Sequence, residues 1–337
     1  MNKIGFACKF SRINHKGQIE AIPELNNKTT TVAWLNRQPT DVATARLWDL
    51  MVHNVQALRN VIINLSTLDE NLRMFRCGSD ILPVYTHRDW KWFWNQHDVI
   101  AYLEKEFAEI GALARNRNVR LSFHPGQFCV LASDRPEVVN SSIDEFEYHA
   151  NVARWLGYGR EFQDFKINVH IAGRLGPAGI LAALQRMSPE ARNCITIEND
   201  EMTWGIADSL VLKDNVALVL DIHHHFIHSG EYITPSDDRF KQIVDSWRGV
   251  RPVIHYSVSR EDVLINHCVD SMPCFNSLIS SGLTKSKLRA HSDYMWNNAV
   301  NEWALSFNDY ADIMVESKAK NLASFRLYEY SNSKKQD

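Results

Sequence analysis

The chain has 337 residues, of which 45% are apolar and 23% charged, a composition typical of a globular protein with a large core. Its formal net charge of −3 gives no overall attraction to nucleic acids or anionic membranes, so an anionic ligand must be drawn by a local field. No apolar stretch approaches the roughly 18 residues of a membrane span, and residues 1–12 lack the apolar core of a signal peptide.

The six cysteines are scattered without C-x-x-C spacing, and several lie in or beside apolar runs. This usage is typical of reduced core thiols in a cytosolic protein. We therefore expect a soluble, cytoplasmic protein.

Short apolar runs alternate with segments of helical periodicity along the chain. The runs predicted as strands are 3–8, 72–77, 119–123, 165–170, 194–198, 216–221, 252–256 and 312–316. The amphipathic segments between them are 41–65, 97–117, 136–156, 177–187, 203–213 and 236–247. Alternation of strand and helix favours a parallel sheet, and eight strands make a barrel. We predict an α/β fold, a single (β/α)8 TIM barrel over residues 1–330, followed by a short, frayed polar tail at 331–337.

Two connections are longer than a minimal loop: 9–40 after the first strand and 257–311 after the seventh. Loops that follow barrel strands form the active face, and long ones usually carry function. The second loop contains KSKLRAH, in which Lys287 and Arg289 precede His291. These two side chains are candidates for phosphate contacts, although such a run is as often a solvated face.

Six predicted strands end at a residue type that binds metals. They are RLSFH at His124, KINVH at His170, ITIE at Glu198, ALVLD at Asp221, PVIH at His255 and DIMVE at Glu316. The active sites of parallel barrels gather at the carboxyl ends of the strands, where such side chains can converge. Six ligands at six strand ends predict one polynuclear metal site there.

Two further histidines complete the candidate ligand set. His224 lies three residues after Asp221 and could serve a neighbouring ion, and His291 lies in the second long loop. A single histidine of this kind is more often a core or loop residue than a ligand. Their occurrence together with the six strand ends reverses that balance.

Imidazoles and carboxylates without thiolates suit Mn²⁺, Zn²⁺ or Fe²⁺ better than a structural zinc site, which would favour cysteine. Eight ligands are too many for one ion and fit two or three, with a carboxylate bridging two of them. Such a cluster would make the site strongly positive within an acidic protein. Its natural reaction is hydrolysis of a phosphodiester.

Several motifs, in order along the chain, resemble the UV damage endonuclease family. They are TTTVAWLNRQ at 29–38, LSFHPGQF at 121–128, INVHIAG at 167–173, TIEND at 196–200, LDIHHH at 220–225 and DIMVESKAK at 312–320. The resemblance covers nearly the whole chain.

The resemblance implies a TIM-barrel DNA repair endonuclease whose substrate is UV-damaged double-stranded DNA. It would nick the duplex on the 5′ side of cyclobutane pyrimidine dimers and 6-4 products, leaving a 3′-hydroxyl and a 5′-phosphate. Its cofactor would be a cluster of two or three divalent ions, Mn²⁺ first, with Zn²⁺, Mg²⁺ or Co²⁺ as alternatives. Neither a membrane nor an obligate protein partner is implied.

The resemblance also implies which residues form the site. The ligand groups would be His124 and His170 with Glu198 as a bridge, then Asp221, His255 and Glu316 with the same bridge, and finally His224 with His291. Glu198 and His255 would also serve catalysis. His87, in LPVYTHRDW, matches a family histidine near the site and is assigned a metal or catalytic role.

The pair Gln127 and Phe128 corresponds to residues that the family inserts into the duplex at the lesion. An apolar ring can replace lost stacking while an amide contacts the orphaned base edges, and Gly126 would allow the tight turn that lifts both outward. The alternative is that Phe128 packs in the barrel mouth. Phe6 matches a family aromatic and is a further candidate for lesion contact.

The chain departs from the family pattern in two places. Family members commonly have lysine two residues before the strand-seven histidine, where this chain has Val253, which can supply neither charge nor ligand. Near the N-terminus, Phe10 stands where the family can show a polar probe. These differences bear on metal tuning and lesion preference.

Two other functions fit the same pattern less well. A sugar isomerase or epimerase of the same barrel type needs one or two metals, whereas this chain has additional histidines at 124, 170, 224 and 291. A non-catalytic protein that binds damaged DNA would not need so complete a ligand set. Metal-dependent cleavage distinguishes the endonuclease from both.

Overall fold

The computed structural model describes residues 2–334, and eight of its strands form one parallel sheet. In chain order they are β1 (Ile4–Ala7), β4 (Met74–Arg76), β5 (Arg120–Phe123), β6 (Lys166–His170), β7 (Ile195–Glu198), β8 (Ala217–Val219), β9 (Val253–Tyr256) and β10 (Asp312–Val315). Across the sheet the order is β8, β7, β6, β5, β4, β1, β10, β9. Each lies inside a range predicted from the sequence.

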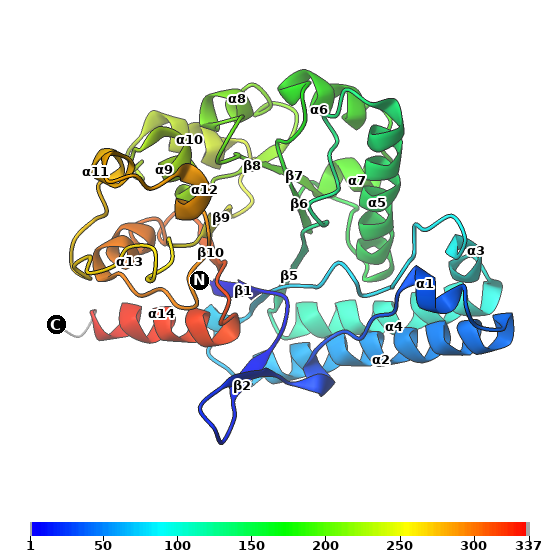
Figure 1. Ribbon diagram of the computed structural model, residues 1–337. Coiled ribbons are helices and arrows are strands. Elements are labelled where there is room, and N and C mark those ends of the chain that lie inside the picture. Colours follow the sequence, from blue (N-terminus) through cyan, green and yellow to red (C-terminus); the bar gives the residue numbers. More distant parts are fainter. Residues whose placement is uncertain (1, 335–337) are drawn as a thin grey trace.

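The two end strands of this sheet, β8 and β9, meet at a single bridge. Asp221 pairs with His255 in parallel, and the N–H of His255 donates to the carbonyl of Leu220 at 2.9 Å. The sheet is therefore a nearly closed barrel with helices around it (Figure 1), and the predicted (β/α)8 fold is confirmed.

The barrel interior has an apolar end and a polar end. Met74, Ala217, Val219, Val253 and Met314, from four strands, pack together with Trp247. Because β4 and β8 are not neighbours in the sheet, these side chains can meet only inside the barrel. Side chains two residues apart on a strand share a face, so the next inward positions are Arg76, Asp221, His255 and Glu316. The strands thus place an apolar plug below a charged layer at their carboxyl ends.

All six predicted amphipathic segments contain a helix. These are α2 (Thr40–Ser66), α4 (His97–Asn116), α5 (Pro136–Trp155), α6 (Gly176–Leu184), α8 (Ile206–Leu210) and α10 (Asp238–Asp245). Helices not predicted are α1 (Val32–Leu35), α3 (Lys91–Trp94), α7 (Pro189–Cys194), α9 (Ile222–Ser229), α11 (Phe275–Ser280), α12 (Lys285–Leu288), α13 (Asn298–Leu305) and α14 (Asn321–Ser333), with 3-10 turns η1 (Pro23–Leu25) and η2 (Glu70–Leu72). None of the helices within residues 2–334 is long and apolar enough to cross a membrane.

Helices α2 and α4 run side by side along one flank of the molecule, with α5 next to them (Figure 1). Where α4 meets the end of α5 the contact is very close. A Cβ built on Gly111 would lie 1.8 Å from the carbonyl oxygen of Leu156. Glycine is therefore the residue that lets these two helices approach.

The first residues of the predicted polar tail are helical and not frayed. Helix α14 continues to Ser333, and Ser331 is buried in it, because the helix packs beside β1. Lys334 pairs with Glu302 at 2.9 Å. Residues 335–337 of the predicted tail lie outside the described part of the chain.

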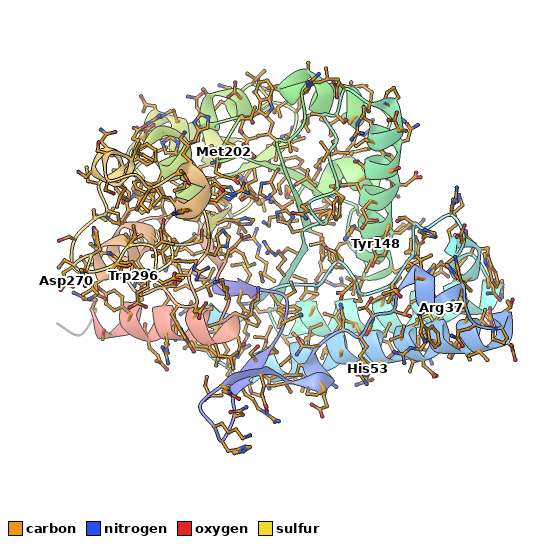
Figure 2. The ribbon with its side chains drawn as sticks, in the orientation of Figure 1. Arg37, His53, Tyr148, Met202, Asp270 and Trp296 are labelled. Carbon is orange, nitrogen blue, oxygen red and sulfur yellow. The ribbon has the colours of Figure 1, made fainter. Side chains whose placement is uncertain are left out.

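The two long loops carry structure of their own. In the first, β2 (Ser11–Ile13) and β3 (Ile19–Ala21) form an antiparallel hairpin that projects from the barrel (Figure 1). In the second, the chain folds back on itself. The indole of Trp296, labelled in Figure 2, donates to the carbonyl of Ser259 at 2.9 Å, and Ser259 bridges to His291. This return brings His291 to the barrel mouth.

Behind β5, His149 on α5 is fully buried, with its ring edge-on to Phe123. Its Nδ1–H donates to the carbonyl of Glu145 at 2.7 Å, while Nε2 has no hydrogen-bond partner in the described structure. Burial lowers the pKa of His149 to about 4. The fold therefore contains this imidazole in its neutral form.

This buried histidine predicts sensitivity to acid in the metal-free protein. Between its ordinary pKa of 6.5 and about 4, the unfolded chain binds a proton that the folded chain does not. The free energy of unfolding should therefore decrease as the pH is lowered through that window, by at most about 3.4 kcal/mol from this residue. His149→Asn keeps a donor but cannot titrate, so its stability should fall less over the same window. Urea unfolding in EDTA at several pH values measures both, and parallel pH dependences would contradict the assignment.

Candidate metal centre

A cavity of about 390 Å³ lies at the carboxyl ends of the barrel strands. Four groups of three side chains there place their ligand atoms within 4.8 Å of one another. The groups are His124, His170 and Glu198; His170, Glu201 and His224; Glu198, Asp221 and His224; and Asp221, His255 and Glu316. The structure thus brings together seven of the eight ligands predicted from the sequence and adds Glu201.

Glu198, at the end of β7, is the centre of the cluster. Its Oε2 lies 3.1 Å from Nδ1 of His255, 3.5 Å from Nε2 of His124 and 3.9 Å from Nε2 of His170. Its Oε1 lies 3.4 Å from Nδ1 of His224. The side chain is fully buried, so both carboxylate oxygens face histidines and none faces solvent. A carboxylate so placed can bridge two ions.

Three buried atoms of the cluster have no hydrogen-bond partner in residues 2–334: Oε1 of Glu198, Oδ2 of Asp221 and Nδ1 of His255. An unpaired buried polar atom is costly, so each such atom in a native protein requires an explanation. A divalent cation satisfies lone pairs of this kind. The mixture of imidazole and carboxylate donors fits Mn²⁺ or Zn²⁺, so the residues present fit a divalent metal centre.

The charges of the cluster are unevenly compensated. Burial alone would raise the pKa of Glu198, but His255 and His170 hold it well below its usual range. Burial also opposes ionisation of Glu316, yet Arg76 holds that pKa well below its usual range. Asp221 behaves in the opposite way, because burial raises its pKa well above the usual range. A bound cation would supply the positive charge that Asp221 lacks.

Hydrogen bonds donated to backbone carbonyls orient two of the histidines. Nδ1 of His124 lies 2.9 Å from the carbonyl of Pro125, and Nδ1 of His224 lies 3.0 Å from the carbonyl of Asn199. A carbonyl can only accept, so Nδ1 carries the proton in both rings and Nε2 presents its lone pair. A hydrogen bond from the ring nitrogen that does not bind the metal fixes the tautomer of a metal-binding histidine.

Three inward-facing residues of the strands touch the cluster and were missed in the sequence. Nζ of Lys166, on β6, lies 2.8 Å from Nε2 of His255, and burial lowers the pKa of Lys166 to about 7. Arg76 pairs with Glu316, and the amide of Asn168 donates to Glu198. The available signal was strand alternation, since all three share a face with a predicted ligand or with the apolar plug.

Lys166 bears directly on the departure at Val253. Val253 is 2% exposed and belongs to the apolar plug, as expected for a residue without charge. The lysine that contacts His255 comes instead from β6. The amine of this lysine therefore reaches the histidine by a route that the sequence motifs do not reveal. In its neutral form the amine can accept from Nε2–H of His255, which leaves the Nδ1 lone pair for an ion.

Three predicted site residues do not join the ligand groups. His291 lines the same cavity but belongs to none of the four groups. His87 lies outside the cavity lining, with Nδ1 3.9 Å from Asp89, so its predicted metal or catalytic role has no support in the geometry. Phe6 is fully buried and packs edge-on to Phe10 and Phe75, so the prediction that it contacts the lesion is wrong in this conformation.

The other predicted DNA contacts lie on the surface around the cavity. Gln127 is exposed and Phe128 is 84% exposed, so Phe128 does not pack in the barrel mouth. Gly126 has neither a positive φ nor any heavy atom within 4 Å of a Cβ built on it. The turn therefore does not require glycine, contrary to the prediction. Lys287 is exposed on α12, while Arg289 turns inward and donates to Glu201 at 2.7 Å.

Comparison with known proteins identifies the family of the chain. The family model described as UV-endonuclease UvdE matches residues 2–336. A UV DNA damage endonuclease from Bacillus cereus (strain B4264) is 25% identical over 313 residues, covering 89% of this chain and 87% of the relative. One from Bacillus mycoides (strain KBAB4) is 26% identical over 295 residues, covering 84% and 82%.

Solved structures share the fold. The crystal structure of SacUVDE, at 22% identity, covers 100% of this chain and 99% of its own, with a TM-score of 0.70. Endonuclease IV from Thermus thermophilus, at 13% identity, covers 82% of this chain and 94% of its own, with a TM-score of 0.54. The resemblance first seen in the motifs is confirmed over nearly the whole length, and the chain belongs to the UV-endonuclease UvdE family.

Proposed function

We propose that this chain is a metal-dependent endonuclease that nicks UV-damaged double-stranded DNA on the 5′ side of a photoproduct, leaving a 3′-hydroxyl and a 5′-phosphate. Membership of the family supports an endonuclease whose substrate is DNA. The observation that carries the proposal is Glu198, a fully buried carboxylate with four histidine nitrogens within 3.9 Å. A buried bridge of this kind suits a cluster of two or three ions.

Divalent ions, when bound, would lower the pKa of a coordinated water towards neutrality and stabilise the charge that develops on the phosphate and the leaving oxygen. Mn²⁺ is the ion we propose first. The residues that would hold the ions are His124, His170, Glu198, Asp221, His224, His255, His291 and Glu316.

The chain's own residues prepare the site around these ligands. Arg76 fixes Glu316, Asn168 fixes Glu198 and Lys166 contacts His255, all inside the barrel. Donors and acceptors that are already oriented need not reorganise when charge develops in the transition state. Glu198 and His255 are therefore assigned catalytic roles, as the members of the cluster with the closest contact.

Gln127 and Phe128 are assigned to the lesion because both lie exposed beside His124. An exposed aromatic ring costs hydrophobic free energy in water, and stacking between bases would recover it. Lys287 would contact phosphate from the exposed surface of α12.

Phe128→Ala should reduce the ratio of nicking on irradiated over untreated DNA by about tenfold, since base stacking on an aromatic ring contributes about 1–3 kcal/mol. Its thermal unfolding midpoint should not change, because the ring is 84% exposed. The matched control is Val211→Ala, an exposed apolar side chain after α8, towards the opposite end of the barrel. An unchanged ratio in Phe128→Ala would exclude this residue from lesion recognition.

The proposed function is tested with supercoiled plasmid, irradiated or untreated, incubated with the protein and Mn²⁺ or with EDTA. We expect the protein to relax the irradiated plasmid in Mn²⁺ but not in EDTA, and to leave the untreated plasmid supercoiled. A DNA polymerase should extend the new ends without phosphatase treatment, as a 3′-hydroxyl requires. Binding to irradiated plasmid without nicking would favour the non-catalytic damage-binding protein. If the protein neither binds nor nicks the irradiated plasmid, the proposal is overturned and sugar substrates become the next test.

A further inference from the structure

We propose that Glu201 is a ligand of the ion on the His170 and His224 side of the cluster, and that Arg289 is the positioning residue that holds Glu201 there. The inference rests on the proposed metal centre. It adds a carboxylate to an ion for which the sequence motifs supply only histidines.

The ligand atoms of His170, Glu201 and His224 lie within 4.8 Å of one another. Because Nδ1 of His224 donates to the carbonyl of Asn199, its free lone pair is on Nε2, which lies 3.9 Å from Oε2 of Glu201. This separation is too long for a hydrogen bond and leaves room for an ion between the two atoms. A carboxylate oxygen also suits a hard cation such as Mn²⁺ better than two imidazoles alone.

A local turn aims Glu201 into the cavity. Oδ1 of Asp200 accepts from the N–H groups of Met202 and Thr203 at 2.7 and 2.6 Å, which turns the chain back directly after β7. Met202, labelled in Figure 2, remains 48% exposed, whereas Glu201 is 9% exposed. The acidic side chain is thus buried while its apolar neighbour faces solvent, a reversal that burial of apolar surface cannot explain.

Arg289 leaves the second carboxylate oxygen free. Its Nη1 donates to Oε1 of Glu201 at 2.7 Å, so Oε2 keeps its orientation towards His224. The Arg289 side chain is 48% exposed, and a guanidinium has five N–H donors, so its outer edge remains open to a phosphate of the duplex. Arg289 therefore connects the surface that would meet DNA with a ligand of the cluster.

Metal content tests this assignment without recourse to activity. Wild type and Glu201→Gln are equilibrated with Mn²⁺, desalted, and measured by inductively coupled plasma mass spectrometry. We expect three ions per wild-type chain and two in Glu201→Gln. The control is Glu20→Gln, which breaks another glutamate–arginine pair, with Arg12 on the β2–β3 hairpin, and should keep three.

Arg289→Gln tests the positioning role. Residues that orient a metal ligand typically contribute about 10- to 100-fold to affinity. Mn²⁺ titration calorimetry should therefore show the weakest-bound ion dissociating at least about tenfold more readily, with the other ions unchanged. This variant leaves the Glu201 carboxylate in place and tests the assignment even if Glu201→Gln fails to fold.

Three ions in folded Glu201→Gln, or unchanged Mn²⁺ affinity in Arg289→Gln, would overturn the inference. Both outcomes leave the proposed function intact, provided that the wild type binds metal and nicks irradiated plasmid. A wild type without bound Mn²⁺ and without nicking would instead remove the metal centre on which the inference rests.

Discussion

Replacing Glu198 with glutamine should abolish the nicking of irradiated DNA, with a loss of about a thousandfold or more. Glutamine has the same shape but lacks the charge of a carboxylate that faces four histidines. If Glu198 bridges two ions, both lose an anionic ligand, and the several kcal/mol of charge stabilisation that a metal contributes to the transition state is lost with them. Initial rates on irradiated plasmid in Mn²⁺ measure the effect.

The interpretation of Glu198→Gln depends on an intact fold. The variant should still fold, which circular dichroism in EDTA checks, because the substitution conserves volume in a packed interior. Glu20→Gln on the hairpin serves again as the matched substitution and should nick at the wild-type rate. Substantial nicking by Glu198→Gln with normal Mn²⁺ content would contradict the assignment of this residue as the bridge.

Gly111→Ala should destabilise the fold by about 3 kcal/mol or more. The new Cβ would meet the backbone of Leu156 at 1.8 Å, and a backbone atom cannot move aside as a flexible side chain can. Alanine is the better helix former by about 1 kcal/mol, so helix propensity alone predicts the opposite sign. Urea unfolding of the metal-free protein measures the change.

The same substitution at Gly126 provides the comparison. No heavy atom lies within 4 Å of a Cβ built there, so Gly126→Ala should change stability by less than about 0.5 kcal/mol. Equal stabilities of the two variants would show that α4 and α5 can separate at little cost.

The eight strands and most of the ligands could be predicted because strand and site share one pattern. A barrel strand is apolar along most of its length and ends at the catalytic face, so a histidine or carboxylate directly after an apolar run marks both at once. His124, Glu198 and His255 were found in this way. The strand boundaries were predicted too widely, because a strand ends where its hydrogen bonds to the neighbouring strands end, and amino-acid composition does not show that point.

The remaining site residues follow from geometry that a linear pattern does not contain. Lys166 and Arg76 lie on the inner face of strands whose outer face is apolar, and their partners are distant in sequence. The position of Glu201 depends on the turn after β7, which directs its side chain into the cavity. Phe6 shows the converse error, because a matching residue type in a matching motif can still face the core.

The bridge between β8 and β9 gives two of the predicted metal ligands a structural role as well. Backbone hydrogen bonds join the strands around the barrel, and β8 and β9 are joined by one bridge. The two residues of that bridge, Asp221 and His255, belong with Glu316 to one ligand group. An ion bound by this group would crosslink β8 and β9 where backbone hydrogen bonding between neighbouring strands is weakest. The metal-free protein is thus least constrained by backbone hydrogen bonds at this ligand group, and binding of an ion there would join the two end strands of the sheet.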